Sequence, residues 1–173
     1  MNKDYFIDLY TYNDWANRQV WACVEKVSDE DYFKDNTFSV GSIFTQLQHT
    51  LAVEDWWLYY LQSGDVVFQS DELKEKLKDR VYLRQHWTQV NKRNMAYIQS
   101  LTDAEIQREV KVIWWEDDYP PITVAQALAQ VANHSTDHRA QTMAVLHTYG
   151  YEGVGQDVLM YLQEAASKEM NGE

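Results

Sequence analysis

The two prolines of this 173-residue chain are adjacent, at positions 120 and 121, so the rest of the chain is free of the residue that most strongly breaks a helix. Apolar residues recur at helical spacing in five segments, at about residues 5–24, 42–62, 71–102, 123–149 and 156–170. The stretch 110–121 reads as irregular or short extended structure. We therefore expect an all-α fold: a four-helix bundle with one short additional helix, in a single domain over residues 1–173.

Capping motifs support these helix boundaries. Thr123 with Gln126 and Thr102 with Glu105 have the spacing of capping boxes, and Gly150 is placed to end the helix that follows Thr123. The segment 71–102 contains no proline or glycine and predicts one continuous helix. The last helix is expected to bury the apolar residues Val158, Leu159, Leu162 and Ala165 or Ala166.

His134 and His138 lie four residues apart in the segment predicted to form the helix 123–149. Residues at positions i and i+4 stand about one turn apart on the same helix face, so both imidazoles can reach one metal ion. The pair differs from the zinc-protease pattern, because Ser135 occupies the position where His-Glu-x-x-His has its glutamate. The spacing predicts a metal site of another kind, which needs a third ligand.

A third imidazole comes from the helix predicted at 42–62. Projected at helical spacing, His49 shares a mainly apolar face with Trp56 and Tyr60, while Leu47, Leu51 and Leu58 point to the opposite side. The predicted metal ligands are therefore His49, His134 and His138, and the expected substrate-pocket residues are Trp56, Tyr60 and Gln141. The alternative is that each inward imidazole is a core residue hydrogen-bonded to a backbone carbonyl, which the sequence leaves open.

Charge and cysteine content exclude several classes of function. The formal net charge is −12, so the basic surface that nucleic-acid binding requires is missing. Cys23 is the only cysteine and lies in an apolar string, which favours a buried structural thiol and excludes an intrachain disulfide. The sequence contains neither a signal peptide nor a membrane span, and we expect a cytoplasmic protein.

Three motifs in order resemble those of the DinB/YfiT-like metalloenzyme family. They are Tyr12-Asn-Asp-Trp15-Ala-Asn17, then Gly41-Ser-Ile-x-x-Gln-Leu-x-His49 followed by Glu54 and Trp56, then His134-x-x-x-His138 before Gln141. The resemblance spans nearly the whole chain. It implies an up-down-down-up bundle, a divalent ion on a three-histidine site and a homodimer, and it places the triad on His49, His134 and His138. The ion is Zn, Ni, Fe or Mn, among which the sequence does not choose.

Three functional hypotheses follow. The first is a transferase in which the metal activates a low-molecular-weight thiol that attacks an electrophile held against Trp56 and Tyr60. The second is a metal-dependent hydrolase that uses Glu54 or Asp137 as a base, although both acids are expected on a solvated helix surface. The third is a non-catalytic, stress-induced homodimer that binds a metal or a ligand. The catalytic residues themselves are unknown at this stage.

Overall fold

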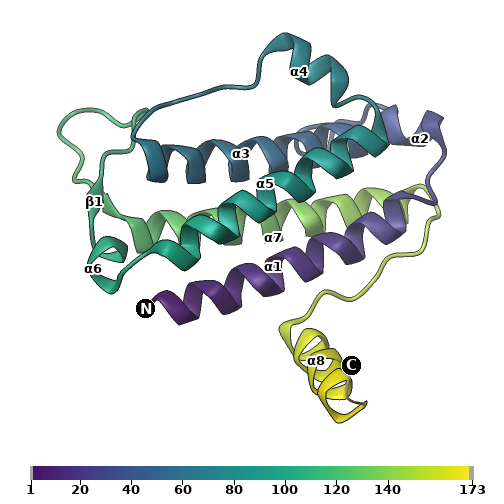
Figure 1. The fold of residues 1–173 in the computed structure, drawn as a ribbon. Helices are drawn as coiled ribbons and strands as arrows, with labels where there is room; N and C mark the ends of the chain where they lie inside the picture. The colour runs from purple at the N-terminus through teal and green to yellow at the C-terminus, as the bar shows by residue number, and fades with distance from the viewer. Residues whose placement is uncertain (1, 172–173) are drawn as a thin grey trace.

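The computed structural model describes residues 2–171, so Met1 and residues 172–173 of the predicted domain lie outside the described residues. Within this range the chain forms eight helices and one pair of two-residue strands (Figure 1). In chain order they are α1 (Lys3–Val24), α2 (Asp29–Phe33), α3 (Ile43–Ser63), α4 (Asp71–Lys76), α5 (Arg80–Ser100), α6 (Asp103–Ile106), β1 (Glu109–Val110), β2 (Ile122–Thr123), α7 (Val124–Thr148) and α8 (Val158–Asn171).

Four long helices build the bundle. Helices α1 and α7 run in one direction and α3 and α5 in the other, which is the up-down-down-up arrangement (Figure 1). Each of α1 and α3 packs against both α5 and α7, so the α1–α5 and α3–α7 interfaces lie on opposite sides of the bundle. The predicted all-α four-helix bundle is confirmed.

Capping residues mark the ends of α3 and the start of α7. Ser42 caps α3 by accepting a hydrogen bond from the backbone N–H of Thr45, and Gly64 ends the helix in the left-handed region at φ 76°. At the start of α7, Thr123 and Gln126 form both halves of a capping box. The two prolines lie in the loop between β1 and β2, which pair antiparallel just before α7. The sequence thus sets where the two helices that carry the histidines begin.

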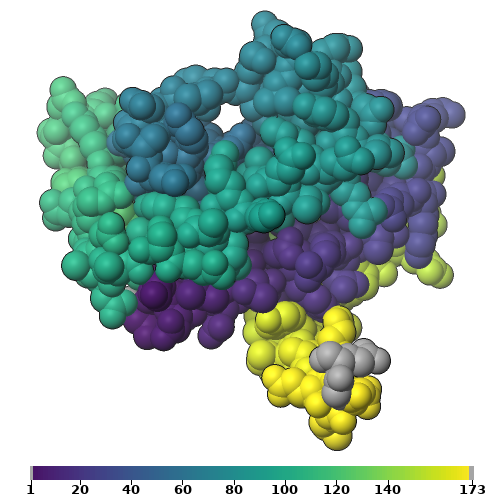
Figure 2. Space-filling model, in the orientation of Figure 1, coloured from purple at the N-terminus to yellow at the C-terminus, as the bar shows by residue number. Residues whose placement is uncertain are grey.

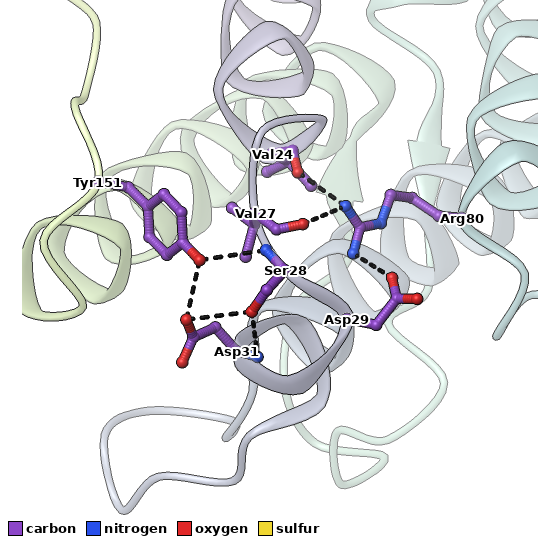
Figure 3. A network of polar contacts seen from close by, with 7 residues as sticks. All are labelled: Val24, Val27, Ser28, Asp29, Asp31, Arg80 and Tyr151. Atoms are coloured by element: carbon purple, nitrogen blue, oxygen red, sulfur yellow. Dashed lines mark hydrogen bonds and ion pairs between the residues drawn. The ribbon is translucent and has the colours of Figure 1, made fainter.

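Arg80, in the first turn of α5, links several segments at the end of the bundle where α1 ends (Figure 3). Its guanidinium donates to the backbone oxygens of Val24 and Val27 at 3.1 and 2.7 Å. It also pairs with Asp29 at 3.0 Å. Beside it, the Tyr151 hydroxyl donates to Asp31 at 2.8 Å. These contacts join the end of α1 to α2, to α5 and to the segment after α7.

The predicted continuous helix over 71–102 is wrong, because the chain forms two helices, α4 and α5, with a break at residues 77–79. The Asp79 side chain accepts a hydrogen bond from the backbone N–H of Tyr82 and so begins a new helix. At the break Leu77 is fully buried in the apolar core. Burial of Leu77 and the Asp79 cap favour a change of direction that apolar spacing alone does not indicate.

The predicted burial of the last helix is also wrong. Helix α8 extends away from the bundle (Figure 1), and none of its residues is buried. Leu159 and Leu162 are 77% and 52% exposed. Helix α8 touches α1 through Glu164, which accepts a hydrogen bond from Trp15 Nε1 at 2.8 Å. The four long helices already cover one another's apolar faces, so α8 finds no groove between them.

The apolar core is divided into two clusters by a layer of polar residues. One cluster lies around Phe6, Leu58 and Leu128, and the other around Leu51 and Leu83. Between them along the helices are the buried polar residues Asn13, Asn17, Glu54, Asn94, Ser135, His138, Arg139 and Thr142. Among residues 2–171, no helix is long and apolar enough to cross a membrane. One of the three predicted metal ligands, His138, belongs to this polar layer.

Candidate metal centre

Three imidazoles converge at the interface between α3 and α7. His49 lies in the second turn of α3, and His134 and His138 lie one turn apart on α7. One ring nitrogen of each residue lies within 4.8 Å of the other two, and the Nε2 atoms of His49 and His134 are 3.1 Å apart. The structure therefore brings together the three residues that the sequence selected.

The cluster lies at the edge of the core rather than at its centre. His138 is buried, whereas His49 and His134 are half-buried. The prediction for the faces of α3 needs a correction, because Leu47, Leu51 and Leu58 point into the core and the His49 face is the partly open one. Helix α3 packs against α2, α5 and α7, so its buried surface covers a wide arc. The rings of His49 and His134 are consequently partly accessible from outside the bundle.

The orientation of His138 is fixed by Gln46, which lies one turn before His49 and is fully buried. His138 Nδ1 lies 2.8 Å from Gln46 Oε1. Because an amide oxygen only accepts hydrogen bonds, Nδ1 carries the proton, and Nε2 keeps a free lone pair. This is the arrangement in which metal-binding histidines are usually held by a neighbouring acceptor.

Burial keeps the three imidazoles neutral. It lowers the pKa of each ring, and for His134 burial, followed by the proximity of His138 and His49, lowers the pKa to about 4. Asp137 acts in the opposite direction on His134 and His138. At pH 7 the rings are therefore uncharged, and each keeps a nitrogen lone pair for a metal ion, as metal binding requires.

The three imidazoles fit a divalent ion. One nitrogen from each neutral ring lies within 4.8 Å of the other two, so their lone pairs crowd a common region. A shared cation bound at these nitrogens would offset that crowding. On the other side of the His134 ring, Nδ1 is buried without a hydrogen-bond partner among residues 2–171. An all-imidazole donor set suits Zn, Ni and Fe. His49, His134 and His138 are the residues that would hold it.

The predicted pocket residues fall into two separate groups. Trp56 stacks on Tyr60 and on Phe68, with ring centroids 5.7 and 6.3 Å apart, and meets Trp114 at 5.0 Å. Gln141 follows His138 by one turn, donates to Asp137 at 2.9 Å and bonds the Ser39 hydroxyl. Trp56 and Tyr60 thus belong to an aromatic cluster farther along α3, whereas Gln141 lies beside the histidines. Their roles toward a substrate stay predictions.

Glu54 is the residue that sequence reasoning placed wrongly. It was expected on a solvated surface, yet it is buried in the polar layer. Its Oε1 accepts hydrogen bonds from Ser135 Oγ at 2.6 Å and from the side-chain amides of Asn13 and Asn17 at 3.0 and 3.4 Å. Its Oε2 accepts from Trp87 Nε1 at 2.7 Å. These donors make burial of a carboxylate tolerable.

The buried cation Arg139 is linked to Glu54 through the side-chain amides of Asn13 and Asn17. Its guanidinium donates to the side-chain oxygens of Asn13 and Asn17, and its Nε donates to Gln156 at 2.9 Å. Burial lowers the pKa of Arg139, and Glu54 partly counteracts this. One signal could have revealed the network: Asn13, Asn17, Glu54 and Asn94 stand at mid-helix positions where the apolar pattern is interrupted.

The comparison with known proteins agrees with this geometry. The DinB family matches residues 1–170 of the chain. The chain belongs to the DinB family. A relative that matches almost its whole length is Protein DinB of Bacillus subtilis (strain 168), which is 24% identical over 169 residues, covering 92% of this chain and 95% of the relative. The three-histidine cluster of this DinB family chain fits a metal-binding protein.

The remaining reactive side chains of this DinB family protein lie outside the histidine cluster. His147 is exposed near the end of α7, and His86 is half-buried on α5. Cys23 is buried, and burial raises the pKa of its thiol, which agrees with a structural role. Trp114 and Trp115, in the loop between β1 and β2, are 58% and 39% exposed. None of these residues joins the three-histidine cluster.

Proposed function

We propose that this DinB family protein is a divalent-metal-dependent transferase that joins a low-molecular-weight thiol to an electrophile. The observation that carries the proposal is the convergence of His49, His134 and His138 between α3 and α7, where two of the three rings are only half-buried. Three protein ligands leave coordination positions for a substrate, which distinguishes catalytic from structural metal sites. The ion would be Zn, Ni, Fe or Mn.

A bound divalent ion would supply one chemical effect here, a lowered pKa of a coordinating thiol. The protein's own groups do the rest. Gln46 holds His138 in one tautomer, and burial keeps His134 uncharged, so the imidazoles present lone pairs rather than protons. In the overall reaction the S–H bond of the thiol breaks, a bond from sulfur to the electrophilic carbon forms, and the leaving group departs with its electron pair. The proton goes to solvent.

The aromatic cluster on α3 supports the electrophile side of the proposal. Trp56 is half-buried and stacks with both Tyr60 and Phe68. Flat aromatic faces bind apolar or conjugated molecules through area burial and stacking. An electrophile held against this cluster would have to extend along α3 to reach a thiol at the histidines.

A hydrolase is the second candidate, and Asp137 is the observation in its favour. Asp137 is exposed on α7 between His134 and His138, and its charge opposes the lowering of the pKa of both rings. In this hypothesis it would be the base that takes a proton from a water. Glu54 is unsuited to this role, because its carboxylate is buried behind Ser135 and already accepts four hydrogen bonds.

A homodimer is part of the proposal. Helix α8 exposes a row of large apolar side chains, which include Leu159 and Leu162. A helix with an uncovered apolar face is stabilised when a second surface buries it. A second copy of the chain is the partner that the DinB resemblance implies, and it also serves the third hypothesis, a non-catalytic metal- or ligand-binding dimer.

The test combines metal content with product detection. Purified wild-type protein and the variants His49→Ala, His138→Ala and His147→Ala are reconstituted with Zn, Ni, Fe or Mn and analysed for bound metal. Each is then assayed with monochlorobimane and a panel of small thiols. We expect metal and fluorescent product in the wild type and in His147→Ala, which changes an exposed histidine outside the cluster. Equal metal content in all four proteins would exclude the triad. Full metal without product would leave the non-catalytic hypothesis.

A further inference from the structure

A second site lies on the side of the bundle opposite the histidines. A cavity of about 340 Å³ opens between α1 and α5, and Figure 2 looks onto the face where α1, in purple, meets α5, in teal. This volume is near the lower end of the range for small-molecule sites. The three histidines take no part in its lining. The cavity is therefore separate from the proposed metal centre.

The floor of the cavity is polar and buried. Asn13, Asn17, Glu54 and Asn94 all line it, and each is at most 4% exposed. Buried polar groups of this number are costly unless they are hydrogen-bonded, and in a cavity they are available to a ligand. The floor is a set of fixed polar groups rather than an apolar gap between helices.

Hydrogen-bonding capacity remains on this floor. Glu54 Oε1 accepts from three donors, but Oε2 accepts only from Trp87 Nε1 among the described residues. A carboxylate oxygen has two lone pairs, so Oε2 can accept one more hydrogen bond. The side-chain amides of Asn13 and Asn17 each donate one of their two N–H groups to Glu54, so the other N–H group remains. The strongest remaining acceptor is thus a buried carboxylate oxygen.

The walls and the rim have complementary features. Trp21 and Trp87 line the cavity and meet edge to face, with ring centroids 5.9 Å apart. Aromatic faces attract ammonium groups as well as apolar side chains. At the rim, Arg18 is paired with Asp14 and Arg84 with Glu25. Lys92 is exposed, lines the cavity and enters no ion pair within residues 2–171.

We propose that this cavity binds a small α-amino acid, with the ammonium group on Glu54 and the carboxylate at Lys92. A buried negative group and an exposed positive group that line the same cavity match the two charges of a zwitterion, and the flexible Lys92 side chain can follow the carboxylate. A simple anion would meet Glu54 at the floor, and a simple amine would leave Lys92 without a partner. The two tryptophans would contact the side chain of the amino acid.

Calorimetric titration with alanine, leucine and phenylalanine tests the proposal. Because amino acids can chelate metals, the titrations use the wild type in excess EDTA and, separately, the His49→Ala/His138→Ala variant. We expect at least one amino acid to bind both proteins equally. The acid that lacks its amine should bind about tenfold more weakly, because it loses the contact with buried Glu54, and the amine that lacks its carboxylate about 3-fold more weakly, because it loses only the contact with exposed Lys92. Binding that disappears in the histidine variant would overturn the proposal.

Two pairs of variants locate the site. Thr88→Trp places a large ring at an exposed residue that lines the cavity and should abolish binding, whereas Gln89→Trp changes the next exposed residue, outside the lining. Lys92→Glu should weaken affinity by about 3- to 10-fold, and Lys26→Glu makes the same charge change at an exposed residue elsewhere. Any one of three results would overturn the proposal. These are no binding by any of the three amino acids, binding of the single-charge analogues as tight as that of the amino acid, and unaltered binding in Thr88→Trp.

Discussion

Glu54 Oε1 accepts a hydrogen bond from Ser135 Oγ at 2.6 Å, and Ser135 stands between His134 and His138 on α7. The buried carboxylate on α3 is therefore connected directly to the helix segment that carries two of the three imidazoles. His49 precedes Glu54 by five residues on the same helix. The polar layer and the proposed metal centre share the contact between α3 and α7.

The variant Glu54→Gln should lower the free energy of unfolding by about 1–3 kcal/mol, because the new amide brings N–H groups against the existing donors. Urea denaturation followed by circular dichroism measures the change. Glu169→Gln, at an exposed position of α8, is the matched control and should leave the stability nearly unaltered. Equal stabilities for the two variants would show that the network contributes little.

Replacement of Gln46 by Leu should weaken metal binding by about 10- to 100-fold, because His138 loses the acceptor that holds its tautomer. Competition with a chromophoric chelator measures the dissociation constant. Gln48→Leu is the control, since Gln48 lies on the same helix and bonds Gln69 instead of a histidine. If both variants bind metal as the wild type does, His138 is not positioned by Gln46.

Stability of the metal-free protein should fall as the pH is lowered. The pKa of His134 is about 4 in the folded chain against 6.5 for an ordinary histidine. Protons therefore bind the unfolded state more readily, so the stabilising contribution is fully present above pH 6.5 and is lost as the pH falls toward 4. Urea midpoints across this window measure the slope. In His134→Ala the slope should be shallower, and an identical slope would contradict the prediction.

The oligomeric state should depend on α8. Leu159→Glu together with Leu162→Glu places charges on the exposed apolar row and should convert a dimer into a monomer. Light scattering coupled to gel filtration gives the mass of each species. Gln163→Glu is the control at a neighbouring exposed residue of the same helix. A wild-type protein that is monomeric at high concentration would exclude the dimer.

The histidine cluster was predictable because two local rules are enough to find it. The i,i+4 spacing places His134 and His138 on one face, and helical projection groups His49 with Trp56 and Tyr60 on one face of a second helix, although that face is the partly open one. Convergence then requires only that the two helices pack together, as they do. Capping residues such as Ser42 and Thr123 are also local signals, so the starts of α3 and α7 were found correctly.

The wrong predictions concern which residues are covered by other parts of the chain. An apolar face on α8 is visible in the sequence, but whether the bundle has room to bury it depends on how four other helices close around one another. Glu54 looked like a surface acid because its partners, Asn13, Trp87 and Ser135, come from three other helices. The break at residues 77–79 likewise depends on where Leu77 packs.

The polar layer has a consequence for how the helices are held along their length. Apolar side chains tolerate a slide of one helix past another, because any apolar neighbour can replace the one that is lost. Glu54 does not tolerate such a slide. A shift of one turn, about 5.4 Å, would separate Glu54 from its hydrogen-bond donors on α1, α5 and α7 together and leave a charge without partners in the interior. The carboxylate thus opposes sliding of the four helices along their axes. It holds the relative height of α3 and α7 on which the meeting of the three imidazoles depends.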